Sequence, residues 1–285
     1  KGSNIVHLPI RNPNPHVTRV KSIVIPKGES GTIPYELFGA KGSNSSVLEL
    51  STINSVDFAR RLKFLLQYPH GCIEQIVSGA FPQLYLPSLA ELSAEEASKC
   101  QANVQSVIMR LRSYQTSDGG FAYWPGGSNY AGHFMLEAAQ KGYTIPQQVK
   151  KNWLRYQKNR ANSWIPDRSG RYYGDDLVQA YRVFTLALAG ETEMGSMNRL
   201  RQQANLSNPA KWRLAAAYAY AGLKEVAAEL ALSLPVSSPE QVYGITYGSP
   251  ERDLAMVIET HIIMGQREEA APLVRRLVAK VNSQS

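Results

Sequence analysis

The sequence predicts a mainly α-helical protein made of helical hairpins, preceded by a short β-rich segment. Three observations support this fold class. From about residue 55 onward, apolar residues recur with helical spacing almost throughout. Glycine and proline interrupt that pattern at intervals typical of helix ends. A unit at 221–228 returns at 264–271, and a repeat of roughly 40 residues is typical of helical-hairpin arrays.

Residues 1–54 are predicted to form the β-rich segment, and residues 55–285 the helical domain. Val17–Val20 and Ser22–Ile25 are rich in β-branched residues, and Ser46–Ile53 alternates polar with apolar residues as a half-buried strand does. A few short strands make a poor independent core. This segment is therefore expected to be part of a larger β structure.

The helical domain shows start and stop signals in order. Phe58, Leu62, Leu65 and Leu66 mark a first helix, and Ser93 with Glu96 forms a capping box for a long one. Later helices are expected to carry proline in the first turn and to end at glycine, at Pro146, Pro209 and Pro250 and at Gly142, Gly190, Gly222 and Gly265. Such an array can open into a solenoid or close into a toroid, and periodicity does not choose.

Length and composition indicate an ordinary globular protein. The 285 residues can form one large domain or one domain with a fragment, and 44% are hydrophobic and 19% charged. No apolar stretch reaches the ~18–20 residues of a transmembrane helix, so we predict no direct membrane insertion. The first residues lack a signal peptide's apolar core and an initiating Met, so we interpret the chain as a fragment of a longer protein.

The net charge of +8 could favour anionic partners. The densest basic cluster, at 150–160, is spread around one expected helix, and no nucleic-acid motif accompanies it. We therefore predict a solvated helix face and no nucleic-acid partner. The His, Cys, Asp and Glu residues lack the spacing of a metal site, so no metal or cofactor is predicted.

The chain has two cysteines with different expected roles. Cys100 falls in an apolar stripe with amphipathic spacing, which predicts a buried core thiol. Cys72 lies three residues before Gln75, at the start of an apolar run that predicts a helix. Residues i and i+3 share one helix face, so the Cys72 sulfur and the Gln75 carbonyl can meet. A thiol and a carboxamide in contact can condense into a thioester.

The residues around this pair fit the same chemistry. Pro69 keeps Tyr68 out of the α region, and Gly71 permits a tight turn before the helix. A thiolate is stabilised at a helix N-terminus by the dipole and by free N–H groups. Glu74 is a candidate local acid or base.

The run Tyr68–Gln75 resembles the thioester signature of the α-macroglobulin and complement thioester family, in which Gly-Cys-x-Glu-Gln carries an internal Cys-to-Gln thioester. The resemblance maps Cys72 as the sulfur donor and Gln75 as the acyl group. Leu8–Pro13, Val17–Val20, Phe81–Leu86 and Gly119–Gly127 are similar to the bacterial branch of that family.

The resemblance implies a fold and a function. The fold is an (α/α)6 toroid, preceded by part of a β-sandwich (CUB-like) module. The function is stoichiometric endopeptidase inhibition in host defence rather than enzymatic turnover: after conformational activation of the full-length protein, the thioester captures an attacking protease through its amines. The partners implied are proteases and the other domains of the parent chain, and the location is extracytoplasmic, either periplasmic or at the cell surface.

The resemblance also bears on the nucleophile. Some thioester proteins use a histidine that enables attack by hydroxyls, but the comparable region here, 175–179, contains none, which predicts a preference for amines. His133, with Glu137 one turn later, is a candidate for assisting the nucleophile, although a surface pair is the favoured interpretation. His70 is a second candidate, with an exposed turn position as its default.

A thioester needs shielding from water. The candidates for shielding are Tyr68, Phe81, Tyr85, Phe121, Tyr123 and Trp124, and core packing is an equally good interpretation of each. Asp175 and Asp176 could suggest a cyclase acid, but a helix N-terminal cap is the favoured role. The alternative for the whole chain is a helical interaction module, toroid or solenoid, in which Cys72 and Gln75 never react.

Overall fold

The computed structural model describes residues 3, 17–21, 23–39, 41–48, 50, 65–121, 125–166, 175–232, 234–236 and 248–283. The chain divides into two compact units, Lys1–Leu50 and Ser51–Ser285. The predicted boundary between residues 54 and 55 lies outside the described residues. Both cysteines and Gln75 belong to the second unit.

The described residues of the first unit contain turns but no assigned strand. One turn follows Pro26, whose carbonyl accepts a hydrogen bond from the Glu29 backbone N–H at 3.0 Å. Val20 and Val24 are more than 80% exposed. Much of Ser46–Ile53 lies outside the described residues, so the β-rich segment and its CUB-like origin stay predictions.

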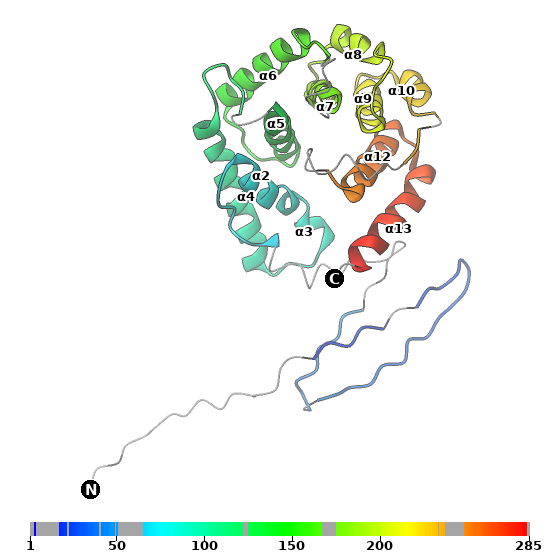
Figure 1. The fold of residues 1–285 in the computed structure, drawn as a ribbon. Coiled ribbons are helices and arrows are strands. Elements are labelled where there is room, and N and C mark those ends of the chain that lie inside the picture. The colour runs from blue at the N-terminus through cyan, green and yellow to red at the C-terminus, as the bar shows by residue number, and fades with distance from the viewer. Residues whose placement is uncertain are drawn as a thin grey trace. The chain divides into compact units, whose positions relative to one another are not determined.

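The second unit is mainly helical, which confirms the broad fold class. Its helices are α2 (Ile73–Ala80), α3 (Leu86–Leu89), α4 (Ala94–Tyr114), α5 (Pro125–Gln140), α6 (Gln147–Asn162), α7 (Asp175–Leu188), α8 (Met194–Arg201), α9 (Asn208–Tyr220), α10 (Lys224–Ala231), α12 (Pro250–Met264) and α13 (Arg267–Ser283), with a short 3₁₀ helix, η1 (Pro82–Leu84). In Figure 1, α5, α7, α9 and α12 lie in an inner layer, and α4, α6, α8, α10 and α13 lie outside them.

The helix ends follow the sequence signals closely. Ser93 caps α4 and accepts a hydrogen bond from the Glu96 backbone N–H. Gly222 and Gly265 are the second residues of the two copies of the repeated unit, with φ of +83° and +85°, the left-handed conformation that glycine adopts without strain. In both copies of the repeat, at 221–228 and at 264–271, the end of one helix is followed by the start of its partner helix.

One proline position differs from the prediction by one residue. Pro250 is the first residue of α12 and Pro209 is the second residue of α9, so both are in the first turn as expected. Pro146 differs, because it is the N-cap of α6.

The first predicted helix lies mostly outside the described residues. Of the four residues that mark it, the structure describes Leu65 and Leu66, and Leu66 packs against Cys100 and Leu86.

Helix α2 is anchored by its apolar face. Ile73, Ile76, Val77 and Ala80 are buried in one cluster with residues of α4 and α5. Fully burying one such branched side chain stabilises the fold by about 1.5–3 kcal/mol. The anchored face fixes the N-terminus of α2 against α4, so the residues that precede the helix are held on a rigid support.

The prediction that Cys100 is a core thiol is confirmed, because its side chain is 1% exposed and forms no disulfide. Within the part of the chain that the structure describes, no helix combines the length and the apolar character needed to cross a membrane.

Candidate functional site: the Cys72–Gln75 turn

The structure brings the two predicted reactive residues together at the start of α2. Cys72 is the N-cap of this helix, in an extended conformation with φ −71° and ψ 173°, and Gln75 is its third residue. The backbone N–H of Cys72 donates a hydrogen bond to Oε1 of Gln75 at 3.0 Å. Both side chains are exposed, and the Cys72 thiol is free. The Gln75 carboxamide is therefore folded back toward the backbone of Cys72, the residue with which the ring would close.

Gly71 makes this approach possible. Its φ of +104° lies in the region that favours glycine, and a Cβ built on it would lie 1.9 Å from Oε1 and 2.8 Å from Cδ of Gln75. The carboxamide of Gln75 thus occupies the space that any other residue at position 71 would fill. The need for glycine is both conformational and steric.

One face of α4 holds the turn that precedes Cys72. Ser106, Arg110 and Tyr114 are spaced four residues apart and so share a helix face. Ser106 Oγ lies 2.8 Å from the Tyr68 hydroxyl oxygen. Arg110 donates to the carbonyl oxygen of Pro69 at 3.0 Å.

The third contact of this face is made by Tyr114. Its hydroxyl donates to the Gly71 carbonyl oxygen at 2.8 Å. Sequence reasoning missed Arg110 and Tyr114. The four-residue spacing is visible in the sequence, but the partners of these side chains lie about 40 residues earlier in the chain.

Glu74, the candidate acid or base, lies between the two reactive residues in the sequence, and its side chain is half-buried. It interacts electrostatically with Tyr130 of α5, which lies on the buried side of α2. Burial raises the pKa of Tyr130, a hydrogen bond with Ser78 opposes this, and the charge of Glu74 raises it further. Glu74 therefore interacts with a side chain of α5, and its role as an acid or base stays a prediction.

His133 lies in a buried polar chain rather than in a surface pair. Its side chain is 10% exposed, Nε2 lies 3.5 Å from Glu137 Oε1, and Nδ1 lies 2.9 Å from the Tyr181 hydroxyl. The Tyr85 hydroxyl donates to the other carboxylate oxygen of Glu137. The favoured interpretation as a surface pair was therefore wrong, because the inner helices enclose this face of α5.

The ring neighbours of His133 place it near the end of α2. Its ring packs edge-on against Phe81, the residue that follows α2, and against Phe184 of α7. Cys72 and Gln75 are at the opposite end of the same helix. For His133 to assist the nucleophile, the two ends of α2 would have to be arranged differently relative to this side chain, so this role stays a prediction.

The predicted shielding residues are in different environments. Phe121 is 2% exposed and packs in the core cluster around α2. Tyr85 is half-buried and hydrogen-bonded to Glu137. Tyr68 is 43% exposed beside the turn. Tyr123 and Trp124 lie outside the described residues.

The region without histidine, 175–179, makes structural contacts. Asp175 accepts a hydrogen bond from the Trp164 indole N–H at 2.8 Å, and Asp176 accepts one from the Ser207 backbone N–H at 2.7 Å. Gln179 is buried and donates to the Ala161 carbonyl oxygen. These contacts join α7 to the segments around it.

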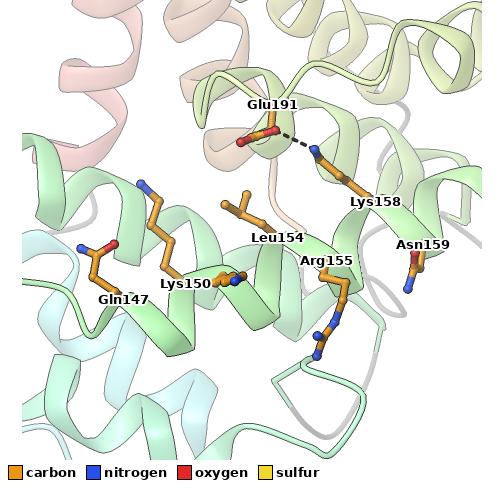
Figure 2. Close-up of a pocket in the computed structure, with 8 residues that line it drawn as sticks. Gln147, Lys150, Leu154, Arg155, Lys158, Asn159 and Glu191 are labelled. Carbon is orange, nitrogen blue, oxygen red and sulfur yellow. Dashed lines mark hydrogen bonds and ion pairs between the residues drawn. The ribbon is translucent and has the colours of Figure 1, made fainter.

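The basic cluster lines a groove on α6. Figure 2 shows Lys150, Arg155 and Lys158 along this helix, with Lys158 paired to Glu191 at 2.6 Å. The groove has a volume of about 400 Å³ and also includes Gln147, Lys151, Leu154 and Asn159. Among the described residues, no group of three or more His, Cys, Asp or Glu side chains could hold a metal ion.

Comparison with known proteins identifies relatives over most of the chain. No protein-family model matches it. Alpha-2-macroglobulin of Escherichia coli K12 is 30% identical over 257 residues, which cover 81% of this chain and 15% of that protein. This chain therefore spans about one sixth of the length of such relatives.

The solved structures agree. Native alpha-2-macroglobulin from Escherichia coli, spanning domain MG7 to the C-terminus, matches with a TM-score of 0.65 and 26% identity over 81% of this chain and 39% of that one. Salmonella alpha-2-macroglobulin reacted with methylamine matches with a TM-score of 0.62 and 26% identity over 81% of this chain and 16% of that one. The chain is thus a homologue of one segment of the bacterial alpha-2-macroglobulins.

Proposed function

We propose that this chain is the thioester domain of a bacterial α-macroglobulin-type protease inhibitor, with an internal thioester between Cys72 and Gln75. The observation that carries the proposal is the hydrogen bond from the Cys72 backbone N–H to Gln75 Oε1, next to a glycine whose missing Cβ leaves room for the carboxamide. The contact holds the Gln75 carboxamide against the backbone of Cys72.

Thioester formation is balanced as a condensation. The Cys72 sulfur adds to Cδ of Gln75, a C–S bond forms, and the C–N bond of the carboxamide breaks. The leaving nitrogen takes the thiol proton and departs as ammonia. The exposed position of both side chains allows the ammonia to leave.

In the capture of a protease, an amine displaces the Cys72 sulfur from the acyl group of Gln75. An amine of the target attacks Cδ of Gln75, a C–N bond forms, and the C–S bond breaks with its electron pair going to sulfur. The proton that the amine loses neutralises the thiolate. The relative solved after reaction with methylamine supports amines as the nucleophile class.

In the full-length protein, this domain would act as a stoichiometric trap rather than as an enzyme. Conformational activation would expose the thioester to the protease that caused it. We further propose that the two helical layers close into an (α/α)6 toroid, that the other domains of the parent chain shield the site, and that the protein acts outside the cytoplasm. The alternation of inner and outer helices supports the toroid (Figure 1).

The test is uptake of isotopically labelled methylamine by freshly purified native protein. We expect one methylamine at Gln75 and release of one titratable thiol, at Cys72. Cys72→Ala is the control and should abolish both signals. A folded protein that takes up no methylamine and keeps Gln75 as an amide would instead be the non-reactive helical module.

A further inference from the structure

We infer that the backbone N–H of Cys72 stabilises the negative charge that develops on Gln75 Oε1 when the thioester forms or opens, and that Arg110 and Tyr114 are positioning residues for this donor. The inference rests on the proposed function and adds to it the groups that control its reactivity. It concerns α4, which contributes no residue to the thioester signature.

The first step concerns the acyl oxygen. Addition of sulfur or of an amine to Cδ of Gln75 converts its carbonyl into a tetrahedral centre, and the electron pair of the π bond moves to Oε1. A hydrogen-bond donor already aimed at that oxygen stabilises the charge without reorganisation. The Cys72 N–H is such a donor, at 3.0 Å.

The second step concerns the peptide unit that carries this donor. The Cys72 N–H and the Gly71 carbonyl belong to the same peptide group. Tyr114 donates to the Gly71 oxygen at 2.8 Å. A hydrogen bond to a peptide oxygen polarises the unit and strengthens its N–H as a donor, since chains of hydrogen bonds are cooperative. Tyr114 therefore both fixes the plane of this peptide and favours charge on Gln75 Oε1.

The third step concerns the direction of the Tyr114 hydroxyl. Arg110 donates to the Tyr114 hydroxyl oxygen at 3.2 Å and to the Pro69 carbonyl oxygen at 3.0 Å. A guanidinium has only donors, so the Tyr114 oxygen accepts from Arg110 and its own hydrogen is directed to Gly71. Arg110 thus sets the polarity of the chain that runs from α4 through the Gly71–Cys72 peptide to Gln75.

Both side chains are half-buried on a long helix whose adjacent face is in the core, where Val104, Val107, Ile108 and Leu111 are fully buried. The support is therefore rigid. A donor held this firmly controls reactivity more precisely than one in a free loop would.

The test compares Tyr114→Phe with the unchanged protein. This substitution removes one hydroxyl and keeps the ring. The readouts are the rate of methylamine addition and the infrared stretching frequency of the thioester carbonyl, after labelling glutamine with carbon-13 at Cδ. We expect addition to slow about fivefold, which corresponds to one neutral hydrogen bond, and the carbonyl frequency to rise because its hydrogen bond weakens.

Tyr218→Phe is the matched control. The Tyr218 hydroxyl also donates a hydrogen bond at 2.7 Å, to Asn198, but in α9 and far from the turn in sequence. It should leave the rate and the carbonyl frequency unchanged. A second variant, Arg110→Lys, keeps the charge but loses the two-pronged contact, and should shift both readouts in the same direction by a smaller amount.

The outcomes separate the two proposals. If the unchanged protein takes up no methylamine, the proposed function fails. If it does, and folded Tyr114→Phe and Arg110→Lys match it in both rate and carbonyl frequency, the positioning role is overturned. A folded Tyr114→Phe protein that forms no thioester while Tyr218→Phe forms one would support the role. Should Tyr114→Phe not fold, Arg110→Lys decides by the same two readouts.

Discussion

A Cβ on residue 71 would lie 1.9 Å from the carboxamide oxygen of Gln75. The substitution Gly71→Ala therefore displaces the acyl group from Cys72 and strains the backbone, whose φ is +104°. We expect loss of methylamine uptake, together with a destabilisation of about 1–2 kcal/mol from the backbone conformation alone. Uptake is measured by mass, and stability by denaturant unfolding.

Gly142→Ala separates the two effects. Gly142 has a φ of +89°, but nothing lies within 4 Å of a Cβ built there. This variant should show a similar loss of stability and keep full methylamine uptake. Equal loss of uptake in the two variants would contradict the steric role of Gly71.

The two cysteines should react with an alkylating reagent under different conditions. Cys100 is 1% exposed, and burial together with the charge of Glu96 raises its pKa, so its thiol should react only after unfolding. Cys72 should be blocked in the thioester and become reactive after methylamine treatment. We expect no labelled thiol in the native protein, one after methylamine treatment, and two when the methylamine-treated protein is then denatured. Native labelling of Cys100 would show that its helix opens readily.

Core packing of the domain is tested at Gly132 in α5. A Cβ there would lie 1.9 Å from the ring of Trp153, which is fully buried and donates to the Ser128 carbonyl oxygen at 2.9 Å. Gly132→Ala should lower the free energy of unfolding by about 3 kcal/mol, at the upper end for overpacking. In Gly195→Ala, in α8, the new Cβ would meet only the end of the Arg199 side chain at 3.9 Å. This variant should raise the free energy of unfolding by up to about 1 kcal/mol. Equal effects would rule out this account of packing.

Acid sensitivity is expected from Glu137. Burial raises its pKa, but hydrogen bonds with His133 and Tyr85 and the charge of Lys141 outweigh this, so the pKa is lowered on folding. A lowered carboxyl pKa contributes stability above the ordinary value of about 4.3 that is lost as pH falls through the folded-state pKa.

Glu137→Gln should therefore cost about 1–2 kcal/mol of unfolding free energy at pH 7, since hydrogen bonds to a charged group are lost. It should also flatten the decline in stability below about pH 4.3. Denaturant unfolding across pH 3–7 measures both effects. Glu268→Gln, at an exposed carboxyl of α13, is the control and should follow the unchanged protein. A parallel decline for Glu137→Gln would refute this source of acid sensitivity.

Local signals made most of the helices predictable. The capping box at Ser93 and the glycines at 222 and 265 act through backbone groups within a few residues, so the sequence contains both partners. Pro146, expected in the first turn of α6, is instead its N-cap. Such a difference moves a helix boundary by one residue without altering the fold.

The candidate site was predictable only in part. The spacing of Cys72 and Gln75 predicts their approach, since both lie within one helical turn. The support from Arg110 and Tyr114 depends on how α4 packs against α2, a contact between segments about 40 residues apart that no local pattern encodes. His133 shows the same limit: its spacing to Glu137 is that of a surface pair, and only the enclosing Tyr181 and Phe184 make it buried.

The intact mass of freshly purified native protein tests the central claim most directly. A thioester between Cys72 and Gln75 predicts a mass lower than that of the sequence by one ammonia, restored with one methylamine added at Gln75, and Cys72→Ala predicts the unaltered mass of its own sequence. A folded protein with the full sequence mass, two titratable thiols after denaturation and no response to methylamine would contradict the account.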